Sequence, residues 1–267
     1  MKITKEAIEL AAKTIQPYIH RTPVLTNQSI NALTGIDFYF KCENFQKIGA
    51  FKIRGGMNAT LSLSPEQLKN GIATHSSGNH AQALAYAAKT LGIKAYIVMP
   101  SSSPQVKVDA VRGYGAEVII CEANQAAREA ALNKVVAQTG AAFIHPYDDY
   151  RVITGQATCV KELIEEITTL DAVITPVGGG GLLSGTCLGA AYFKPELKVY
   201  GAEPEGAADA VLSIQSGKVE KAPFIKTIAD GLMTTLSEQT LSIIKEYVTA
   251  ILLVSEEEII AALRLIY

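Results

Sequence analysis

The stretch that decides this chain is Phe51-Lys52-Ile53-Arg54-Gly55-Gly56, inside the longer run 41–56. It sets one lysine beside an aromatic ring, at the start of a predicted helix and just beyond a predicted strand. A buried lysine loses its charge readily, because desolvation penalises the ammonium form, and its neutral amine can then attack a carbonyl group. Most lysines near the start of a helix are solvated or ion-paired, so Lys52 gains meaning only from the other motifs.

A second motif is the run Gly178-Gly179-Gly180-Gly181, which follows a strand predicted over 172–177. Without Cβ atoms, successive N–H groups can converge on an anion at a helix N-terminus, where the helix dipole also favours negative charge. The alternatives are a tight turn with positive φ and a dinucleotide site with Glu203 as the ribose-binding acid. The dinucleotide fingerprint G-x-G-x-x-G fails, because Leu183 or Ser184 stands where its third glycine would be.

A third motif, Ser76-Ser77-Gly78-Asn79-His80, precedes a helix predicted over 79–91. Ser and Asn are ordinary N-caps, but the start of a helix can also bind a carboxylate through its backbone amides. Together the three motifs indicate an aldehyde cofactor held by Lys52, with its phosphate in the glycine loop. The histidines His20, His75 and His145 lie apart in the sequence, without ligand spacing, and are predicted to be structural.

Composition limits the class of protein and the partners that we expect. The length of 267 residues allows one large or two modest domains, and 48% hydrophobic with 19% charged residues indicates a globular chain. A net charge of −2 gives no reason to expect nucleic acid or an anionic membrane as a partner. The four cysteines have no zinc or disulfide spacing, and no apolar signal core begins the chain, so we expect a cytoplasmic protein with reduced thiols.

Helices and strands are predicted to alternate along the chain. The strands are short and apolar, and they are predicted over 38–40, 72–74, 95–98, 117–120, 142–144, 172–175 and 198–202. The helices are predicted from Thr4 to before Pro17, over 79–91, 104–113, 124–138 and 152–167, and from Leu182 onward. This alternation predicts an α/β fold with parallel sheets covered on both faces. Residues 204–223 are predicted to form a long loop or a small excursion from the sheet.

The combination and order of these motifs resemble the fold-type II pyridoxal-phosphate enzymes, and within them the serine racemase and threonine dehydratase family. The matching segments occur in the family's order, at 43–55, 76–83, 155–156, 178–181 and 227–231. The resemblance implies a tryptophan-synthase-beta-like fold with two parallel-sheet domains. These would be a large cofactor domain over 1–70 and 149–267, and a small mobile domain over 71–148 that binds the substrate carboxylate.

The resemblance also implies roles for single residues. Lys52 would be the Schiff-base lysine, Phe51 would pack on the cofactor ring, and Asn79 would bond the ring hydroxyl. The cofactor phosphate would be held by Gly178, Gly179, Gly180, Gly181 and Leu182. The substrate would be bound by Ser76, Ser77, Gly78, Asn79, His80 and Arg128, of which Arg128 matches a racemase arginine associated with domain closure.

One position separates the subfamilies. The usual threonine dehydratases have alanine where this chain has Ser77, and the racemase serine is the acid/base on the cofactor face opposite the lysine. The resemblance therefore implies catalysis by Lys52 and Ser77, with L-serine converted to D-serine and to pyruvate plus ammonia. The alternative is a threonine or 3-hydroxyaspartate dehydratase; this chain shares Tyr147 with the dehydratases and with some microbial racemases, whereas the animal racemases have asparagine there.

A metal site is implied by the segment from Glu203 to Asp209, which follows the racemase spacing. The Glu203 and Asp209 carboxylates and the Ala207 carbonyl would bind a hard divalent cation, Mg²⁺ or Ca²⁺, with Mn²⁺ as a further candidate. The alternative is that both acids belong to a solvated loop.

The family continues beyond the position of Tyr267, into a segment whose first side chain meets the pyridine nitrogen of the cofactor. We therefore expect the chain to be C-terminally truncated, and an inactive cofactor-binding remnant is a further alternative. The helix from Ser255 ends on apolar residues, which also predicts a continuation. Relatives imply a homodimer that acts on a small hydroxy amino acid.

Overall fold

The protein is described by a computed structural model that covers residues 3–266, and the described chain divides into two compact units. Unit 1 comprises 9–20 and 44–155, and unit 2 comprises 3–8, 21–43 and the residues from 156 onward. All of 71–148 lies in unit 1, together with 44–70. The division into a large domain over 1–70 and 149–267 and a small domain over 71–148 stays a prediction.

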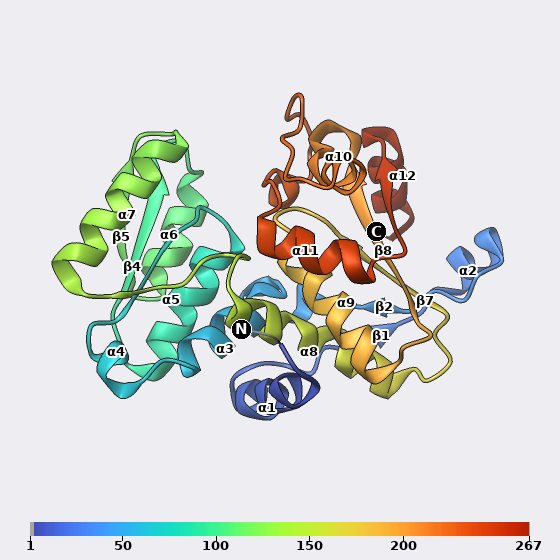
Figure 1. The fold of residues 1–267 in the computed structure, drawn as a ribbon, viewed down its shortest axis with the longest axis horizontal. Coiled ribbons are helices and arrows are strands. Elements are labelled where there is room, and N and C mark those ends of the chain that lie inside the picture. Colours follow the sequence, from blue (N-terminus) through green and yellow to red (C-terminus); the bar gives the residue numbers. More distant parts are fainter. Residues whose placement is uncertain (1–2, 267) are drawn as a thin grey trace. The chain divides into compact units, whose positions relative to one another are not determined.

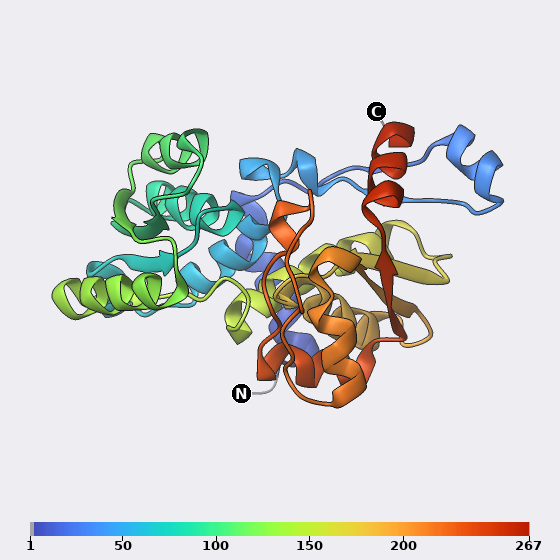
Figure 2. The same cartoon turned by 90° about the horizontal axis from the view of Figure 1, so that it is seen from above.

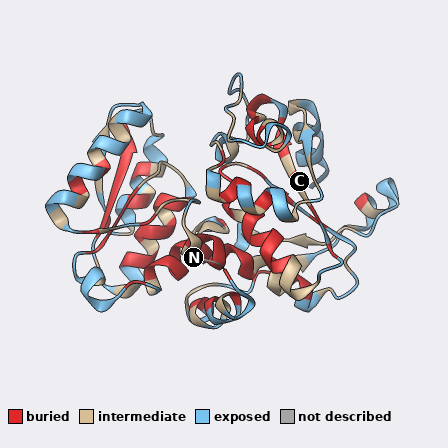
Figure 3. Ribbon diagram, viewed as in Figure 1, coloured by how far each residue is buried: buried red, intermediate tan, exposed pale blue. Residues whose placement is uncertain are grey.

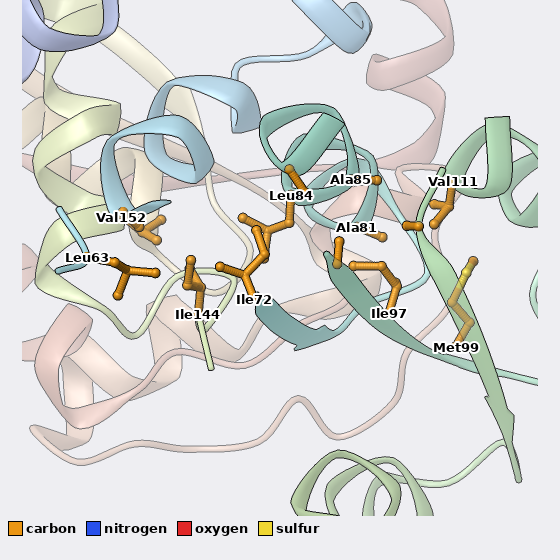
Figure 4. Packing of buried hydrophobic residues seen from close by; sticks show 14 of the residues in the cluster. Leu63, Ile72, Ala81, Leu84, Ala85, Ile97, Met99, Val111, Ile144 and Val152 are labelled. Carbon is orange, nitrogen blue, oxygen red and sulfur yellow. The ribbon is translucent and has the colours of Figure 1, made fainter. Parts of the chain in front are cut away.

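Unit 1 is built on a parallel sheet with helices on both faces (Figure 1). Its strands lie in the order β5 (Glu117–Cys121), β4 (Ala95–Pro100), β3 (Ile72–His75) and β6 (Ala142–Phe143). The side chains of β4 alternate between two clusters, one on each face of the sheet. On one face, Tyr96 and Val98 pack with residues of α7 (Gln125–Thr139). Ile97 and Met99 pack on the other face, in the core formed with α5 (Asn79–Leu91) and α6 (Gln105–Gly113), part of which Figure 4 shows.

The helix that begins at Lys52 belongs to unit 1 because it packs closely on α5. In α3 (Lys52–Leu61), Ile53 and Met57 are fully buried and contact the same cluster as Ala83 and Ala87 of α5. A Cβ atom on Gly56 would lie 3.1 Å from the Cβ of Ala83, so the glycine allows the two helices to approach. The short helix α4 (Pro65–Lys69) follows and leads into β3.

Unit 2 has a second parallel sheet, in the order β7 (Ala172–Pro176), β8 (Lys198–Pro204) and β9 (Ala250–Val254). One face packs on α9 (Gly181–Phe193), which Figure 3 shows as largely buried, and on α11 (Glu238–Tyr247). A separate antiparallel pair, β1 (Val24–Leu25) and β2 (Phe40–Lys41), carries the exposed helix α2 (Gln28–Thr34) at its tip (Figure 2). The remaining helices are α1 (Lys5–Ile15), α8 (Tyr150–Glu166), α10 (Asp209–Ser216) and α12 (Glu256–Ile266).

The predicted α/β fold with parallel sheets is confirmed, and two segments differ in detail from their predictions. The strand predicted over 38–40 is β2, which is antiparallel and begins only at Phe40. The loop predicted over 204–223 contains α10, because the Glu203 carboxylate accepts the N–H groups of Ala210 and Val211 in its first turn. The helix predicted from Ser255 is α12, capped by Ser255, and Tyr267 lies outside the described residues.

No helix in the described range 3–266 is both long enough and apolar enough to cross a membrane.

Candidate active site

Lys52 lies at the first position of α3 with its amine buried in unit 1. Its Nζ donates a hydrogen bond to the Pro146 carbonyl at 3.0 Å and lies 5.3 Å from the centre of the Phe51 ring. Burial lowers the pKa of Lys52 from 10.5 to about 8, and the acceptor is an uncharged carbonyl rather than a carboxylate. The amine is therefore neutral in a large fraction of molecules at mildly alkaline pH, as a nucleophile or base requires.

The turn that leads to Lys52 is fixed by a glutamine that the sequence did not single out. Gln46 is buried, and its side chain accepts the His20 N–H at 2.9 Å and donates to the His20 carbonyl at 2.6 Å. The following Ile48 has φ of 63°, a costly conformation for a β-branched residue. Its side chain packs against the cluster that contains Ile53, which holds this strained turn in place.

The serine loop, residues 76–80, connects β3 to α5 in unit 1. The N-cap of α5 is Gly78, and no side chain caps the helix; Ser76 Oγ instead lies 3.4 Å from the Gly78 nitrogen. The capping alternative for these serine and asparagine side chains is therefore wrong. Since the first N–H groups of a helix lack intrahelical partners, this end of α5 is free to bind an anion through its backbone. Ser77 is half-buried and Asn79 is exposed.

His80 is buried in the first turn of α5, with one nitrogen lacking a protein partner. Its Nε2 lies 3.2 Å from the Ile144 carbonyl and must donate, because a carbonyl only accepts. Desolvation, with a further contribution from the Lys52 charge, lowers the pKa of His80 to about 3, so the ring is neutral and Nδ1 is an acceptor. Nδ1 has no hydrogen-bond partner among the described residues, and a donor group on a bound ligand would satisfy it.

Arg128 lies on α7 in the same unit. It is half-buried, and its Nε has no hydrogen-bond partner among the residues that the structure describes. The pKa of His75, at the end of β3, is lowered mainly by burial. The positive charge of Arg128 lowers this pKa further. Unit 1 thus brings Arg128 to the carboxyl edge of the sheet, where the serine loop also begins.

His75 and His145 lie apart in the sequence but come close together in the fold. Strands β3 and β6 are parallel neighbours with Ala73 paired to Phe143, and each histidine follows two residues later along the chain, His75 at the end of β3 and His145 just beyond β6. Their ring centres are consequently 6.0 Å apart. Within the described residues, however, no group of three or more His, Cys, Asp or Glu side chains could hold a metal ion.

The glycine loop lies in unit 2, between β7 and α9. Gly180 has φ of 84°, and a Cβ atom there would lie 2.7 Å from Leu236 Cδ2 and 2.9 Å from Thr240 Cβ. A Cβ atom on Gly178 would be 3.2 Å from the Gly231 carbonyl. The loop backbone is therefore packed from behind, and no side chain caps α9, which leaves its first N–H groups to an anion such as phosphate. Leu182 is half-buried at the start of this helix.

Two buried carboxylates also lie in unit 2. Glu203 is 0% and Asp209 is 3% exposed, and the Asp209 carboxylate accepts the Leu236 N–H at 3.0 Å. Burial raises the pKa of Asp209 to about 6 and the pKa of Glu203 to about 7. The negative charge of the neighbouring Asp209 further raises the pKa of Glu203. A divalent cation would offset this charge, with the Ala207 carbonyl and water as further ligands, so the donor set fits a hard cation. Both acids are buried side by side, so the alternative in which they belong to a solvated loop is wrong.

The two units thus hold the predicted site residues separately. Lys52, Phe51, the serine loop and Arg128 lie in unit 1, and the glycine loop, Leu182 and the acid pair lie in unit 2. The buried amine of unit 1 fits an aldehyde group, and the uncapped N-terminus of α9 behind the glycine loop of unit 2 fits a phosphate group.

Comparisons with known proteins agree with this fit. Residues 15–267 match the family described as "Pyridoxal-phosphate dependent enzyme". The chain is 50% identical to the serine racemase of Dictyostelium discoideum, over 99% of this chain and 82% of that protein. It is 48% identical to the beta-hydroxyaspartate dehydratase of Paracoccus denitrificans, over 99% of this chain and 84% of that protein. The structure of maize serine racemase is 42% identical, with a TM-score of 0.97 over 98% of this chain and 80% of that one.

The chain therefore belongs to the pyridoxal-phosphate dependent enzymes of fold type II, and pyridoxal 5'-phosphate is its cofactor.

Proposed function

We propose that this enzyme is a racemase and ammonia-lyase acting on serine, which converts L-serine to D-serine and to pyruvate plus ammonia. The observation that carries the proposal is the buried Lys52 amine, with its pKa lowered to about 8 and an uncharged carbonyl as its acceptor. The 50% identity to a serine racemase supports serine as the substrate.

Several of the predicted residues would each hold one part of the cofactor. Lys52 would carry its aldehyde group, Phe51 would pack on its ring and Asn79 would bond the ring hydroxyl. Its phosphate would be bound at the N-terminus of α9 by Gly178, Gly179, Gly180, Gly181 and Leu182. When bound, pyridoxal phosphate withdraws electrons from the bonds at the Cα atom of an attached amino acid.

The side chains of unit 1 would then move protons on the substrate. Ser76, Ser77, Gly78, Asn79 and His80 would bind the substrate carboxylate at the N-terminus of α5. Lys52, as a neutral amine, would accept the Cα proton of L-serine on one face. Ser77 would donate a proton to Cα from the opposite face, which gives D-serine. Loss of the β-hydroxyl as water would instead give 2-aminoacrylate, which water hydrolyses to pyruvate and ammonia. We also propose that 71–148, with Arg128, forms the mobile part that closes on substrate.

A divalent cation would be held in unit 2 by Glu203, Asp209 and the Ala207 carbonyl. The raised pKa values of the two acids support this proposal, because a buried carboxylate pair is most favourable when a cation offsets its charge. Mg²⁺, Ca²⁺ and Mn²⁺ are the candidates, and the site would act on stability and on the neighbouring segment rather than on the substrate.

A threonine or 3-hydroxyaspartate dehydratase is the second candidate function. It is favoured by the 48% identity to a beta-hydroxyaspartate dehydratase. A hydroxyl at position 77 favours the racemase, since elimination from one enantiomer does not require a second acid/base.

We further expect a cytoplasmic homodimer with neither nucleic acid nor a membrane as partner. The scattered spacing of the four cysteines, which lacks a disulfide framework, is the sequence feature behind this expectation.

In the decisive experiment, the purified protein is first loaded with pyridoxal phosphate. It is then incubated separately with L-serine, L-threonine or L-threo-3-hydroxyaspartate as substrate. We expect D-serine by chiral chromatography and pyruvate by a coupled assay, both abolished in Lys52→Ala. Borohydride reduction followed by peptide mapping should place the cofactor label on Lys52. Label on another lysine, or turnover of hydroxyaspartate without formation of D-serine, would contradict the proposal.

A further inference from the structure

One short segment of unit 1, Ile144–Asp148, supplies backbone acceptors to two side chains of the candidate site. The Pro146 carbonyl accepts the Lys52 hydrogen bond at 3.0 Å, and the Ile144 carbonyl accepts that of His80 at 3.2 Å. The Ile144 side chain is fully buried in the core of unit 1, which anchors the start of this segment (Figure 4). Where the two carbonyls point decides where the Lys52 amine and the His80 ring are held.

The turn of this segment is closed by the His145 imidazole rather than by a backbone acceptor. His145 Nδ1 accepts the Asp148 N–H at 2.8 Å and the Tyr147 N–H at 3.3 Å. The ring also packs edge-on against Tyr147, with the ring centres 4.7 Å apart, and against His75 and Phe143. Both hydrogen bonds require a lone pair on Nδ1, so they exist only while that nitrogen is unprotonated.

The hydrogen bond from Tyr147 is linked to Lys52 through a single peptide unit. The Pro146 carbonyl and the Tyr147 N–H belong to the same planar trans peptide, in which the two groups point in opposite directions. Proline has no N–H of its own and a fixed φ, so the orientation of this peptide depends on the rotation that follows it. When His145 fixes the Tyr147 N–H on one side, the Pro146 carbonyl is aimed at Lys52 on the other.

The surroundings of His145 keep its Nδ1 available as an acceptor. Burial lowers the pKa of His145 to about 4. Asp148 and Asp149 act in the opposite direction, while His75 and Lys52 lower the pKa further. The ring is therefore neutral across the range in which the Lys52 amine titrates, and the turn keeps its geometry there.

We infer that His145 is a positioning residue for Lys52: by accepting the Tyr147 and Asp148 N–H groups, it orients the peptide whose carbonyl holds the Lys52 amine. The inference rests on the proposed function only for what Lys52 does with substrate, and not for the geometry. An uncharged acceptor aimed in this way places the amine without the charge of a carboxylate, which would stabilise the ammonium form.

The test separates the acceptor of His145 from its ring. His145→Asn keeps an acceptor at the same number of bonds from Cα but removes the ring. His145→Phe keeps the ring and its packing but removes the acceptor, and His145→Gln moves the acceptor one bond further out. His75→Phe changes the neighbouring ring of the same cluster and is the matched control.

Two readouts are needed. The first is competitive labelling of the cofactor-free full chain with trace acetic anhydride across a pH series, with the Lys52 peptide quantified by mass spectrometry. We expect the pH midpoint for Lys52 to fall in the Phe and Gln variants, because the ammonium form loses its aimed acceptor, and to be unchanged in the Asn variant and in His75→Phe. The second is turnover of the loaded enzyme, where kcat should fall by ~10²-fold in the Phe and Gln variants with little change in KM, and remain near the wild-type value in the Asn variant.

The inference would be overturned if the labelling midpoint of Lys52 were unchanged or raised in folded His145→Phe. If the Phe variant does not fold, the same result in His145→Gln would overturn it. The same shift in His145→Asn would also overturn it, since the ring and not the acceptor would then matter. Because the labelling uses no substrate, its outcome stands whichever amino acid the enzyme turns over.

Discussion

The backbone N–H of Leu236 donates to Oδ2 of Asp209 at 3.0 Å, and through this bond the acid pair is connected to the glycine loop. The Leu236 side chain is buried and lies where a Cβ atom on Gly180 would come within 2.7 Å of it. Leu236 is thus held by the carboxylate on one side and supports the loop backbone on the other. A change in the charge or position of Asp209 therefore acts on the proposed phosphate site through one residue.

We expect a divalent cation to stabilise the protein through Glu203 and Asp209. Addition of Mg²⁺ or Ca²⁺ to chelator-treated protein should raise the Tm, because the ion offsets the charge of two buried carboxylates. Asp209→Asn should remove this response, whereas Glu205→Gln, which changes a neighbouring acid outside the pair, should retain it. Thermal unfolding with and without chelator measures the change in Tm. An equal change in the wild type and in Asp209→Asn would show that Asp209 has a structural role and does not bind the cation.

Gly180→Ala should weaken both stability and cofactor binding. The substitution introduces a positive-φ alanine and a contact of 2.7 Å with Leu236, so the loop must move. Gly92→Ala is the matched control, because Gly92 has φ of 67° and a Cβ atom there would meet nothing within 4 Å. Backbone strain alone costs about 1–2 kcal/mol at each site. Urea unfolding and titration with pyridoxal phosphate should show a further loss in Gly180→Ala alone, and equal effects of the two substitutions would argue against a tightly packed phosphate loop.

Ser77→Ala should suppress racemisation while much of the elimination from L-serine remains. Loss of a general acid/base costs ~10²–10⁴-fold in the step that it serves, and only racemisation and the use of D-serine need proton exchange on the second face. Ser76→Ala, which removes the neighbouring hydroxyl of the proposed carboxylate site, serves as the control because it should lower racemisation and elimination together. Formation of D-serine at a rate near that of the wild type would show that Ser77 is not the second acid/base.

The protein should lose stability as the pH falls below about 6.5, in part because of His80. Its pKa is lowered to about 3 in the folded state, whereas the unfolded chain binds the proton near the ordinary value of 6.5. Protons therefore favour the unfolded state in this interval, and His80 alone should cost about 1 kcal/mol between pH 7.5 and pH 5.5. Urea unfolding at the two pH values should show a smaller difference in His80→Asn than in the wild type. The exposed His20, replaced by Asn, is the control, and an undiminished difference in His80→Asn would assign the acid loss to other groups.

Much of the fold follows from local sequence patterns. The helix over 79–91 and the strands that flank it are found as predicted, because periodic apolar residues and turn glycines act within a few residues along the chain. The glycine loop was predictable for the same reason: four adjacent glycines between a strand and a helix leave few other conformations. Lys52 and the serine loop likewise lie at the starts of helices, as the local pattern predicts.

Only the tertiary structure decided the rest, because the interactions concerned join residues far apart in the chain. Helix α10 exists where a loop was predicted because Glu203, outside the helix, accepts its first N–H groups. His75 and His145 meet through the register of β3 and β6, which no local pattern specifies. The sequence alone placed a lysine next to Phe51, but burial in unit 1 lowers its pKa, and the Pro146 carbonyl, 94 residues away along the chain, holds its amine. Desolvation and hydrogen-bond geometry depend on the folded surroundings, so the chemistry of Lys52 was determined by its environment and not by its identity.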